Sequence, residues 1–293
     1  MNGLLLIDKP PGVTSHDAVS RLRRHTGIRR IGHAGTLDPF ATGLLLLLFG
    51  RATRLSQFFT GMDKEYRVRV RLGQESDTFD ITGKVIRERP VDVSYEQFTR
   101  ILRDFLGHIE QVPPMFSAVK IRGRRLYELA REGQEVERPS RSVSIHCLKM
   151  LTPQQDWTAS GPTREAEILV RCSSGTYIRS LVHDIGARLG CGALVSELHR
   201  TAAGSYQVED ALLLDHAGPD TIKANLIPME RLLQDIPSVT VSVVEFQRIC
   251  HGQDLSPRPA VQQGWVRLLD QQENLVALGN VSQSGIHPDI VLV

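Results

Sequence analysis

Residues 64–73 read KEYRVRVRLG and alternate strictly between two kinds of side chain. Tyr66, Val68, Val70 and Leu72 occupy the even positions, and arginines occupy positions 67, 69 and 71 between them. A period of two is that of a β-strand, whose successive side chains point to opposite faces of a sheet. One buried and one polar face are typical of antiparallel sheets. The stretch therefore predicts an antiparallel sheet with one basic, exposed face.

Strands and helices are interspersed on both sides of this stretch. Short apolar runs bounded by turn residues predict further strands at Gly3–Asp8, Leu44–Phe49 and Glu165–Cys172. Apolar residues at helical spacing predict helices after a cap at Thr14 or Ser15, over Ser94–Leu106 and over Thr176–Leu189. We therefore expect residues 1–234 to form an α+β domain on a mixed, mostly antiparallel sheet.

The character of the sequence changes near Ile236-Pro237. Residues 235–293 carry three basic and six acidic side chains, whereas the whole chain has a net charge of +2. Short β-type runs at Val239–Val243, Trp265–Leu269 and Leu275–Leu278 surround one short helix that contains Phe246 and Ile249. This pattern predicts a small, β-rich C-terminal domain over residues 235–293.

Composition and motifs exclude several classes of function. Of the 293 residues, 41% are hydrophobic and 23% are charged, as in ordinary globular proteins. No apolar run approaches the roughly 20 residues of a membrane span. The four cysteines form no CxxC pair, and the chain has no P-loop, GxGxxG or HExxH motif. We therefore expect a cytoplasmic protein with no membrane partner and no metal, and with neither hydrolase, kinase nor dehydrogenase chemistry.

Basic residues gather in two local clusters. One lies within residues 21–30, and the other consists of Lys120, Arg122, Arg124 and Arg125. Charge alone fits a solvated face as well as an RNA-binding face. The second cluster falls within residues 112–141, where paired prolines and sparse apolar residues predict a mobile excursion from the domain. Its one amphipathic piece is Leu126–Arg131.

The segment Gly32–Gly43 reads GHAGTLDPFATG and is the strongest candidate for a functional site. Its three glycines permit unusual backbone conformations and close approach of a ligand. Asp38 stands in this loop before the apolar run Leu44–Phe49, an arrangement that holds a reactive side chain on a rigid support. An Asp-Pro pair also begins ordinary type I turns, so the residues alone leave a structural role for Asp38 open.

The same segment resembles the signature of the TruB-type tRNA pseudouridine-55 synthases. Four other segments resemble motifs of this family in the same order: LIDKPPG at 6–12, DKEYRV at 63–68, VPPMFSAVK at 112–120 and GTYIRS at 175–180. Five ordered matches make the resemblance highly specific. It implies a pseudouridine synthase catalytic domain over 1–234, an RNA-gripping thumb over 112–141 and, more weakly, a PUA-like domain over 235–293.

The resemblance implies that the chain isomerises uridine to pseudouridine at position 55, in the T loop of tRNA. This reaction neither gains nor loses atoms or electrons, so it requires no cofactor. By resemblance Asp38 is the essential carboxylate, as nucleophile at C1′ or as base at C2′, and Arg179 holds it ionised. Tyr66 is the platform for a flipped uridine and a candidate for proton transfer. Tyr177 and Leu198 line the pocket.

Further RNA contacts are implied outside the pocket. His33 matches a residue beside the flipped nucleotide, and phosphate contacts are expected from Arg54, Arg67, Lys120, Arg122, Arg124 and Arg125. The chain departs from the family after Leu198, where two basic residues are common. Here His199, largely uncharged at neutral pH, precedes Arg200, which puts a phosphate contact in question but not the chemistry.

We expect a monomeric, self-sufficient enzyme of the bacterial type whose partner is the T arm of tRNA and which requires no protein partner. Archaeal and eukaryotic relatives need a guide RNA, and the chain has no extended basic tail or insertion that suggests such dependence. Two alternatives stay open. One is a guide-dependent rRNA pseudouridine synthase, and the other is a tRNA-folding chaperone that acts by binding alone.

Overall fold

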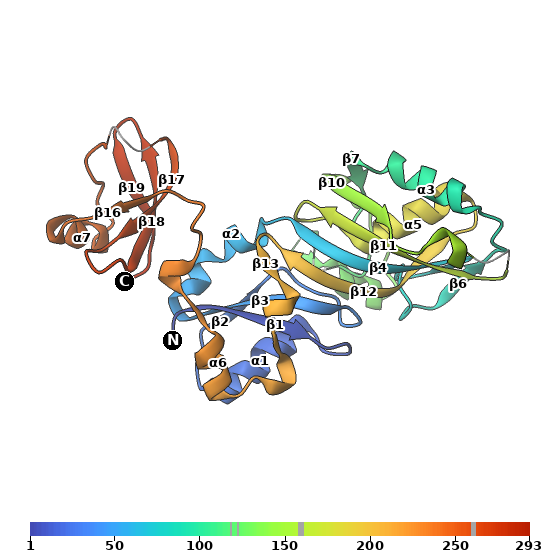
Figure 1. The fold of residues 1–293 in the computed structure, drawn as a ribbon, viewed down its shortest axis with the longest axis horizontal. Coiled ribbons are helices and arrows are strands. Elements are labelled where there is room, and N and C mark those ends of the chain that lie inside the picture. Colours follow the sequence, from blue (N-terminus) through green and yellow to red (C-terminus); the bar gives the residue numbers. More distant parts are fainter. Residues whose placement is uncertain (118, 122, 158–160, 259–261) are drawn as a thin grey trace.

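The computed structural model describes residues 1–117, 119–121, 123–157, 161–258 and 262–293. An eleven-stranded sheet forms its centre (Figure 1). Its main path runs through β14 (Leu212–Leu213), β1 (Gly3–Lys9), β3 (Thr42–Phe49), β12 (Ala193–Ala203), β4 (Lys64–Leu72), β11 (Arg164–Cys172), β10 (Arg141–Met150) and β7 (Gly107–Gln111). Off this path, β2 (Ile31–Ala34) pairs with β3, β13 (Tyr206–Gln207) with β12 and β15 (Ile227–Pro228) with β1.

The pairing in this sheet is mostly antiparallel. β1 pairs with β14 and β3 pairs with β12 in parallel, and the other pairs run antiparallel. Two small hairpins lie outside the sheet, one made by β5 (Gln74–Ser76) and β6 (Val85–Glu88). The prediction of a mixed, mostly antiparallel α+β domain is confirmed.

Strands of the sheet differ in how many faces they bury. β4 buries one face, as its alternation predicts, and directs its arginines to the other. There Arg67, Arg69 and Arg71 pair with Glu167, Glu197 and Glu165 of the neighbouring strands. This row of glutamates neutralises the basic face. β1 and β3 are buried on both faces, which explains why their sequences are continuous apolar runs.

Four helices share one hydrophobic core with the buried face of β4: α1 (Ser15–Thr26), α3 (Tyr95–Asp104), α5 (Ile178–Leu189) and α6 (Pro219–Asn225). α1 begins at the expected cap, where Thr14 accepts a hydrogen bond from the Asp17 N–H, and ends at Gly27 with φ +69°. α3 begins at a matching cap on Ser94. Within the described ranges, none of the helices has the length and apolarity to cross a membrane.

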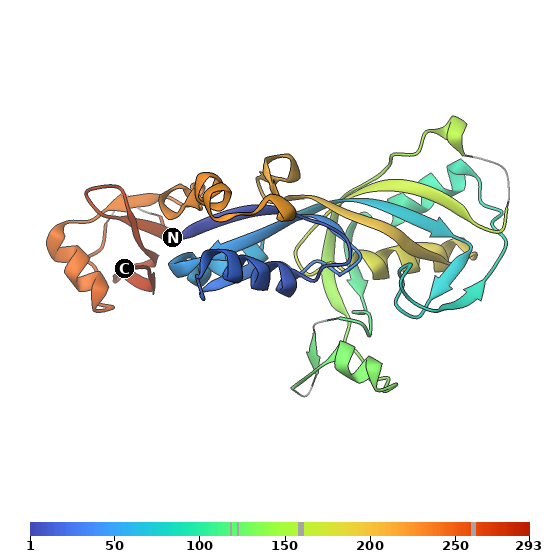
Figure 2. The same ribbon diagram turned by 90° about the horizontal axis from the view of Figure 1, so that it is seen from below.

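The thumb segment, residues 112–141, projects from the body of the domain (Figure 2). It contains a hairpin of β8 (Lys120–Ile121) and β9 (Arg124–Arg125), followed by α4 (Leu126–Arg131). Leu126 and Leu129 are buried, and the Leu126 N–H donates to the Val119 carbonyl at 2.8 Å. The segment therefore has more regular structure than its composition suggested.

The C-terminal strands form a separate four-stranded sheet at one end of the molecule (Figure 1). Its order is β16 (Ser238–Thr240), β17 (Gly264–Leu269), β18 (Leu275–Ser282) and β19 (Gly285–Val291), beside α7 (Val243–Cys250). The β-rich character is as expected, but β19 was not anticipated because it contains His287, Pro288 and Asp289 and has no apolar run.

This small sheet packs against the large domain through β18 and α2 (Ser56–Thr60). Val276 and Ala277 face the core of the small sheet, whereas Leu275 and Leu278 join a cluster of residues from β1 and β3. At its rim, Phe58 and Trp265 meet edge to face with ring centres 5.0 Å apart.

We predict that Leu278→Ala lowers the free energy of unfolding by about 2–5 kcal/mol, because it opens a cavity at a fully buried contact between the two sheets. Urea denaturation measures this change. The control is Val244→Ala, on α7 of the C-terminal domain and 68% exposed, which should change stability by less than about 0.5 kcal/mol. Equal effects of the two substitutions would contradict a tightly packed interface.

Candidate active site

Asp38 lies in the loop between β2 and β3. The Ala41 N–H donates to the Asp38 carbonyl at 3.1 Å, so the Asp-Pro turn is present. The N-terminal segment holds this loop through three bonds: Gly12 N–H to the Pro39 carbonyl (2.8 Å), Ser15 Oγ to the Leu37 carbonyl (3.2 Å) and Leu37 N–H to Ser15 Oγ (2.9 Å). The turn therefore gives the Asp38 carboxylate a fixed support.

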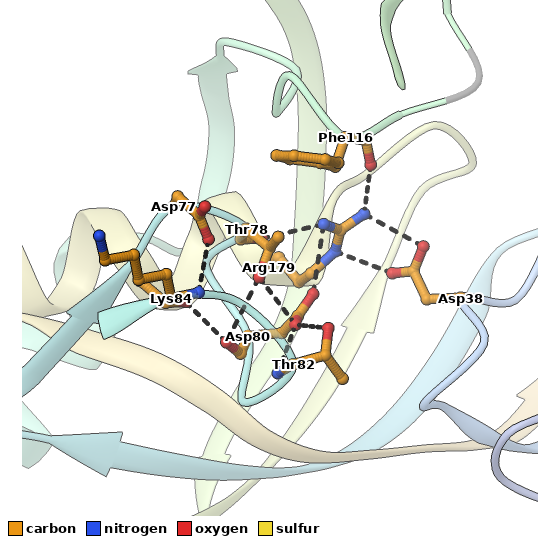
Figure 3. Close-up of polar contacts among 9 residues, drawn as sticks. Asp38, Asp77, Thr78, Asp80, Thr82, Lys84, Phe116 and Arg179 are labelled. Carbon is orange, nitrogen blue, oxygen red and sulfur yellow. Dashed lines mark hydrogen bonds and ion pairs between the residues drawn. The ribbon is translucent and has the colours of Figure 1, made fainter. Parts of the chain in front are cut away.

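Arg179, at the start of α5, forms a two-point ion pair with Asp38 (Figure 3). Its Nε lies 2.8 Å from Oδ2, and its Nη2 donates to Oδ1 at 3.1 Å. Other donors of the guanidinium reach the Thr78 and Phe116 carbonyls at 2.9 and 2.8 Å. The Arg179 side chain is 5% exposed. This planar fork fixes both the position and the orientation of the carboxylate.

A second carboxylate, not expected from the sequence, contacts the same arginine (Figure 3). Asp80 Oδ2 lies 3.4 Å from Arg179 Nη1, and the Asp80 side chain is 4% exposed. Asp80 Oδ1 accepts hydrogen bonds from Thr78 Oγ1 (2.9 Å), Thr82 N–H (2.9 Å) and Thr82 Oγ1 (2.5 Å). The one sign of a role for Asp80 in the sequence is a threonine two residues before it and another two residues after it. Such a pattern is equally typical of a surface turn.

The Asp38–Arg179 pair borders a pocket of about 260 Å³. Tyr66 of β4 and Leu198 of β12 line it from the sheet, and Tyr177 lines it from the turn before α5. Gln111 at the end of β7 fixes that turn, because its side chain accepts from the Tyr177 N–H (3.0 Å) and donates to the Tyr177 carbonyl (3.2 Å). The fold thus brings the predicted pocket residues together from four separate segments.

Three of the predicted RNA-contacting residues lie away from this pocket. His33 is on β2 and is not among the lining residues. Arg54 is exposed in the 3-10 helix η1 (Gly50–Leu55) and donates to the Val291 carbonyl of the C-terminal sheet. Arg67 is on the opposite face of β4 from Tyr66 and is paired with Glu167 at 2.8 Å. The geometry gives Arg67 no approach to the pocket.

The basic residues of the thumb are placed in part. Lys120 and Arg125 face each other in the backbone register of the β8–β9 hairpin. The Arg124 side chain is 48% exposed and is paired with Glu132. Arg122 lies outside the described residues.

Burial governs the acid–base character of the pocket. It raises the pKa of Asp38, the Arg179 guanidinium opposes this rise, and the negative charge of Asp80 adds to it. Burial also raises the pKa of Tyr66 and of Tyr177, so both phenols are neutral hydrogen-bond donors near neutral pH. The arrangement offers one aimed carboxylate beside a small cavity flanked by aromatic rings, which suits attack on a bound nucleoside or proton removal from it.

Models of one protein family match nearly the whole chain. The model described as TruB family pseudouridylate synthase, N-terminal domain, matches residues 23–178. Two C-terminal models, for tRNA pseudouridylate synthase B and for pseudouridine synthase II TruB, match residues 179–234 and 237–292. The chain belongs to the TruB family of pseudouridylate synthases. The Asp38 loop, β4 and the thumb all fall within the match to the N-terminal model.

Individual TruB relatives are similar over comparable lengths. The chain is 38% identical over 294 residues to tRNA pseudouridine synthase B of Aquifex aeolicus, covering 100% of both chains. It is 42% identical over 258 residues to that of Geobacillus thermodenitrificans, covering 86% of this chain and 85% of the relative. A solved Cbf5-Nop10-Gar1 complex contains a similar chain, with a TM-score of 0.72 and 26% identity over 99% of this chain and 85% of that one. A second solved structure, an H/ACA RNP bound to a substrate RNA containing 2′-deoxyuridine, gives 0.71 and 25% over the same shares.

We predict that Asp80→Asn lowers the pKa of Asp38, because it removes a nearby negative charge while the amide oxygen still accepts from Thr78 and Thr82. NMR titration of the Asp38 carboxyl carbon measures this shift. Asp77→Asn in the same loop is the control and should leave the Asp38 titration unchanged, since Asp77 is exposed and accepts only from the Lys84 N–H among the described contacts. A higher Asp38 pKa in Asp80→Asn would show instead that Asp80 acts mainly by holding Arg179 in place.

Proposed function

We propose that this chain isomerises uridine to pseudouridine at position 55 in the T loop of tRNA, as a monomer and without a guide RNA. The observation that carries the proposal is the Asp38–Arg179 ion pair at the pocket, in a chain similar over its full length to proteins named tRNA pseudouridine synthase B.

Asp38 is the essential carboxylate in this proposal. It acts either as nucleophile at C1′ or as base at C2′, and both routes require it to be ionised. Burial raises the pKa of Asp38 and works against ionisation, and the two-point contact with Arg179 opposes that effect in part. The same contact orients the carboxylate oxygens toward one side of the pocket.

A uridine in a folded T loop reaches Asp38 only after it leaves its stack. The pocket supports this step because it is sized for one nucleoside rather than for a duplex. Tyr66 supplies a ring on which the extruded base stacks, and its neutral hydroxyl is available for proton transfer. Tyr177 and Leu198 complete the apolar wall.

The thumb and the loops around the pocket supply phosphate contacts, which position RNA without reading its sequence. Arg124 keeps an exposed head, and its partner Glu132 lies in the same projecting segment. Arg67 faces the other side of the sheet and is paired with Glu167, so its predicted phosphate contact lies outside the pocket.

A guide-dependent rRNA pseudouridine synthase is the second candidate. Its support is that the similar chains in solved structures belong to a Cbf5-Nop10-Gar1 complex and to an H/ACA RNP. Identity to those chains is 25–26%, whereas identity to the curated bacterial relatives is 37–42%. Conversion of a bare T-arm minihelix by the purified chain separates the two, since it supplies no guide.

We predict that Asp38→Asn abolishes pseudouridine formation in a T-arm minihelix and leaves RNA affinity within a few fold of wild type, because affinity comes mainly from cations. Single-turnover conversion and filter binding give the two numbers. The control is Asp215→Asn, which alters a 69% exposed carboxylate paired with Arg21 and should retain full activity. Turnover by Asp38→Asn free of wild-type enzyme would refute the assignment, and folding activity retained by Asp38→Asn would reveal a separate chaperone role.

We further predict that replacing Lys120, Arg122, Arg124 and Arg125 with Gln weakens RNA binding and flattens its salt dependence, because fewer counterions are released. The rate at saturating RNA should fall far less than the affinity. The control variant replaces Arg69 and Arg71 on the rear face of β4 with Gln and should keep the wild-type salt slope. An unchanged slope in the thumb variant would count against a gripping thumb.

A further inference from the structure

Two buried cations lie at the pocket and have no carboxylate partner within 4.0 Å among the described residues. Lys64 is 6% exposed and Arg200 is 1% exposed, and both line the pocket. Lys64 Nζ donates to the Thr60 and Met62 carbonyls at 2.6 and 2.5 Å. Arg200 donates from Nε to the Leu44 carbonyl at 2.7 Å and from Nη2 to the Gly35 carbonyl at 3.0 Å. These partners are neutral, so the two charges are solvated but not neutralised.

Sheet geometry places both cations beside Tyr66. Lys64 is two residues before Tyr66 on β4, so their side chains share a face. Arg200 is directly opposite Tyr66 in the β4–β12 ladder. The pocket thus has two regions: in one, Arg179 contacts the two carboxylates of Asp38 and Asp80, and in the other Lys64 and Arg200 leave a local excess of positive charge.

An unpaired buried charge costs several kcal/mol, so its presence at a pocket indicates a ligand that supplies the opposite charge. RNA offers two kinds of anion, its phosphates and the uracil ring once it has left the sugar. Phosphates of an extruded nucleotide stay at the pocket mouth, because they connect to nucleotides that remain in the loop. Lys64 and Arg200 are almost fully shielded from solvent, and they flank the tyrosine on which the base stacks in the proposed function.

The reaction creates such an anion. When the C1′–N1 bond breaks heterolytically, its electron pair stays on uracil, which then carries one negative charge. Meanwhile Asp38 either forms an ester bond to C1′ or takes the C2′ proton and leaves a glycal. The uracil charge is consumed when C5 bonds to C1′, as Asp38 leaves C1′ or returns its proton to C2′, and the C5 proton then moves to N1. Atoms, protons and electrons balance on either route.

We propose that Lys64 and Arg200 form a cation pair that stabilises the detached uracil anion between bond cleavage and rejoining. The inference rests on the proposed function. Fixed cations in a water-poor site act on charge that develops during the reaction, and they bind the neutral base much less strongly. They therefore raise the rate of the chemical step with little effect on RNA affinity. They also keep the free base in the pocket while it turns.

The test replaces each cation with a neutral side chain of similar length, Lys64→Met and Arg200→Met. The single-turnover rate at saturating T-arm RNA should fall on the order of 10²-fold in each variant, with the RNA dissociation constant within a few fold of wild type. Arg71→Gln is the control, because it removes a cation from the same strand on the opposite face, and it should keep the wild-type rate. Lost affinity with a normal rate would reassign the pair to phosphate binding, and an unchanged rate with unchanged affinity would refute any role.

A second readout does not depend on removing a buried charge. Burial and the nearby Arg200 lower the pKa of Lys64 to about 8, against the influence of Cys172 and Asp63. The wild-type rate should therefore fall as pH rises through about 8, while Lys64→Arg, which stays charged, should keep its rate there. Lys9 has a similarly lowered pKa and interacts with the charge of Asp38, so a fall that persists in Lys64→Arg would assign the pH dependence to another group and refute the titration of Lys64 as its cause.

Failure of the proposed function and failure of the cation-pair proposal give different experimental results. If the wild-type protein converts no uridine in tRNA or its T arm, the proposed function is wrong and the cation pair has no anion to stabilise. If the wild type converts uridine and Lys64→Met, Arg200→Met and Arg71→Gln convert it equally fast, only the cation-pair inference is wrong.

Discussion

The Arg179 guanidinium is the contact on which the arrangement of the site depends. It reaches the Asp38 loop, the Asp80 loop and the Phe116 carbonyl at the base of the thumb, and it is itself carried by α5. Removing one partner from a buried ion pair commonly costs about 3–5 kcal/mol, because the other charge is left uncompensated. Four segments distant in sequence are therefore held in register by one side chain, and the carboxylate has a defined direction before any RNA binds.

The central sheet gives this contact a rigid base and separates two electrostatic environments. On the rear face of β4, arginines and glutamates of three strands alternate and cancel in solvent. On the front face, the same strand directs Lys64 and Tyr66 into the pocket, where charge is shielded from water. A strand with period-two alternation thus places equal charges in very different surroundings, and only those on the buried side act strongly on a bound nucleoside.

Local patterns predicted much of the fold. The alternation of residues 64–73 corresponds to β4, the cap at Thr14 begins α1, the helix predicted over Ser94–Leu106 is α3, and the amphipathic piece at 126–131 is α4. These predictions are correct because a helix cap and side-chain periodicity depend only on residues that are close together in the sequence. β19 was missed because its stability comes from pairing with β18 and from burial of Ile286, neither of which its own sequence reveals.

The site was predictable where a motif marked it and obscure where only tertiary contact defines it. The family resemblance gave the residues Asp38, Tyr66, Tyr177, Arg179 and Leu198, and the fold gathers them at one pocket, although their roles stay predictions. Asp80 lies in a polar stretch that resembles a surface turn, and its contact with Arg179 joins positions far apart in sequence. In the sequence, Arg200 stands out only as one of the two residues after Leu198 where the family often has two basic side chains, and its burial between β3, the Asp38 loop and β4 comes from tertiary contacts.

The most direct measurement is nucleotide-resolution mapping of pseudouridine in an unmodified tRNA transcript incubated with the purified chain and no other RNA or protein. A self-sufficient enzyme built around Asp38 and Arg179 should convert uridine 55 to completion and leave every other uridine unchanged. Absence of conversion until a guide RNA or partner protein is added, or conversion at another position, would contradict that conclusion.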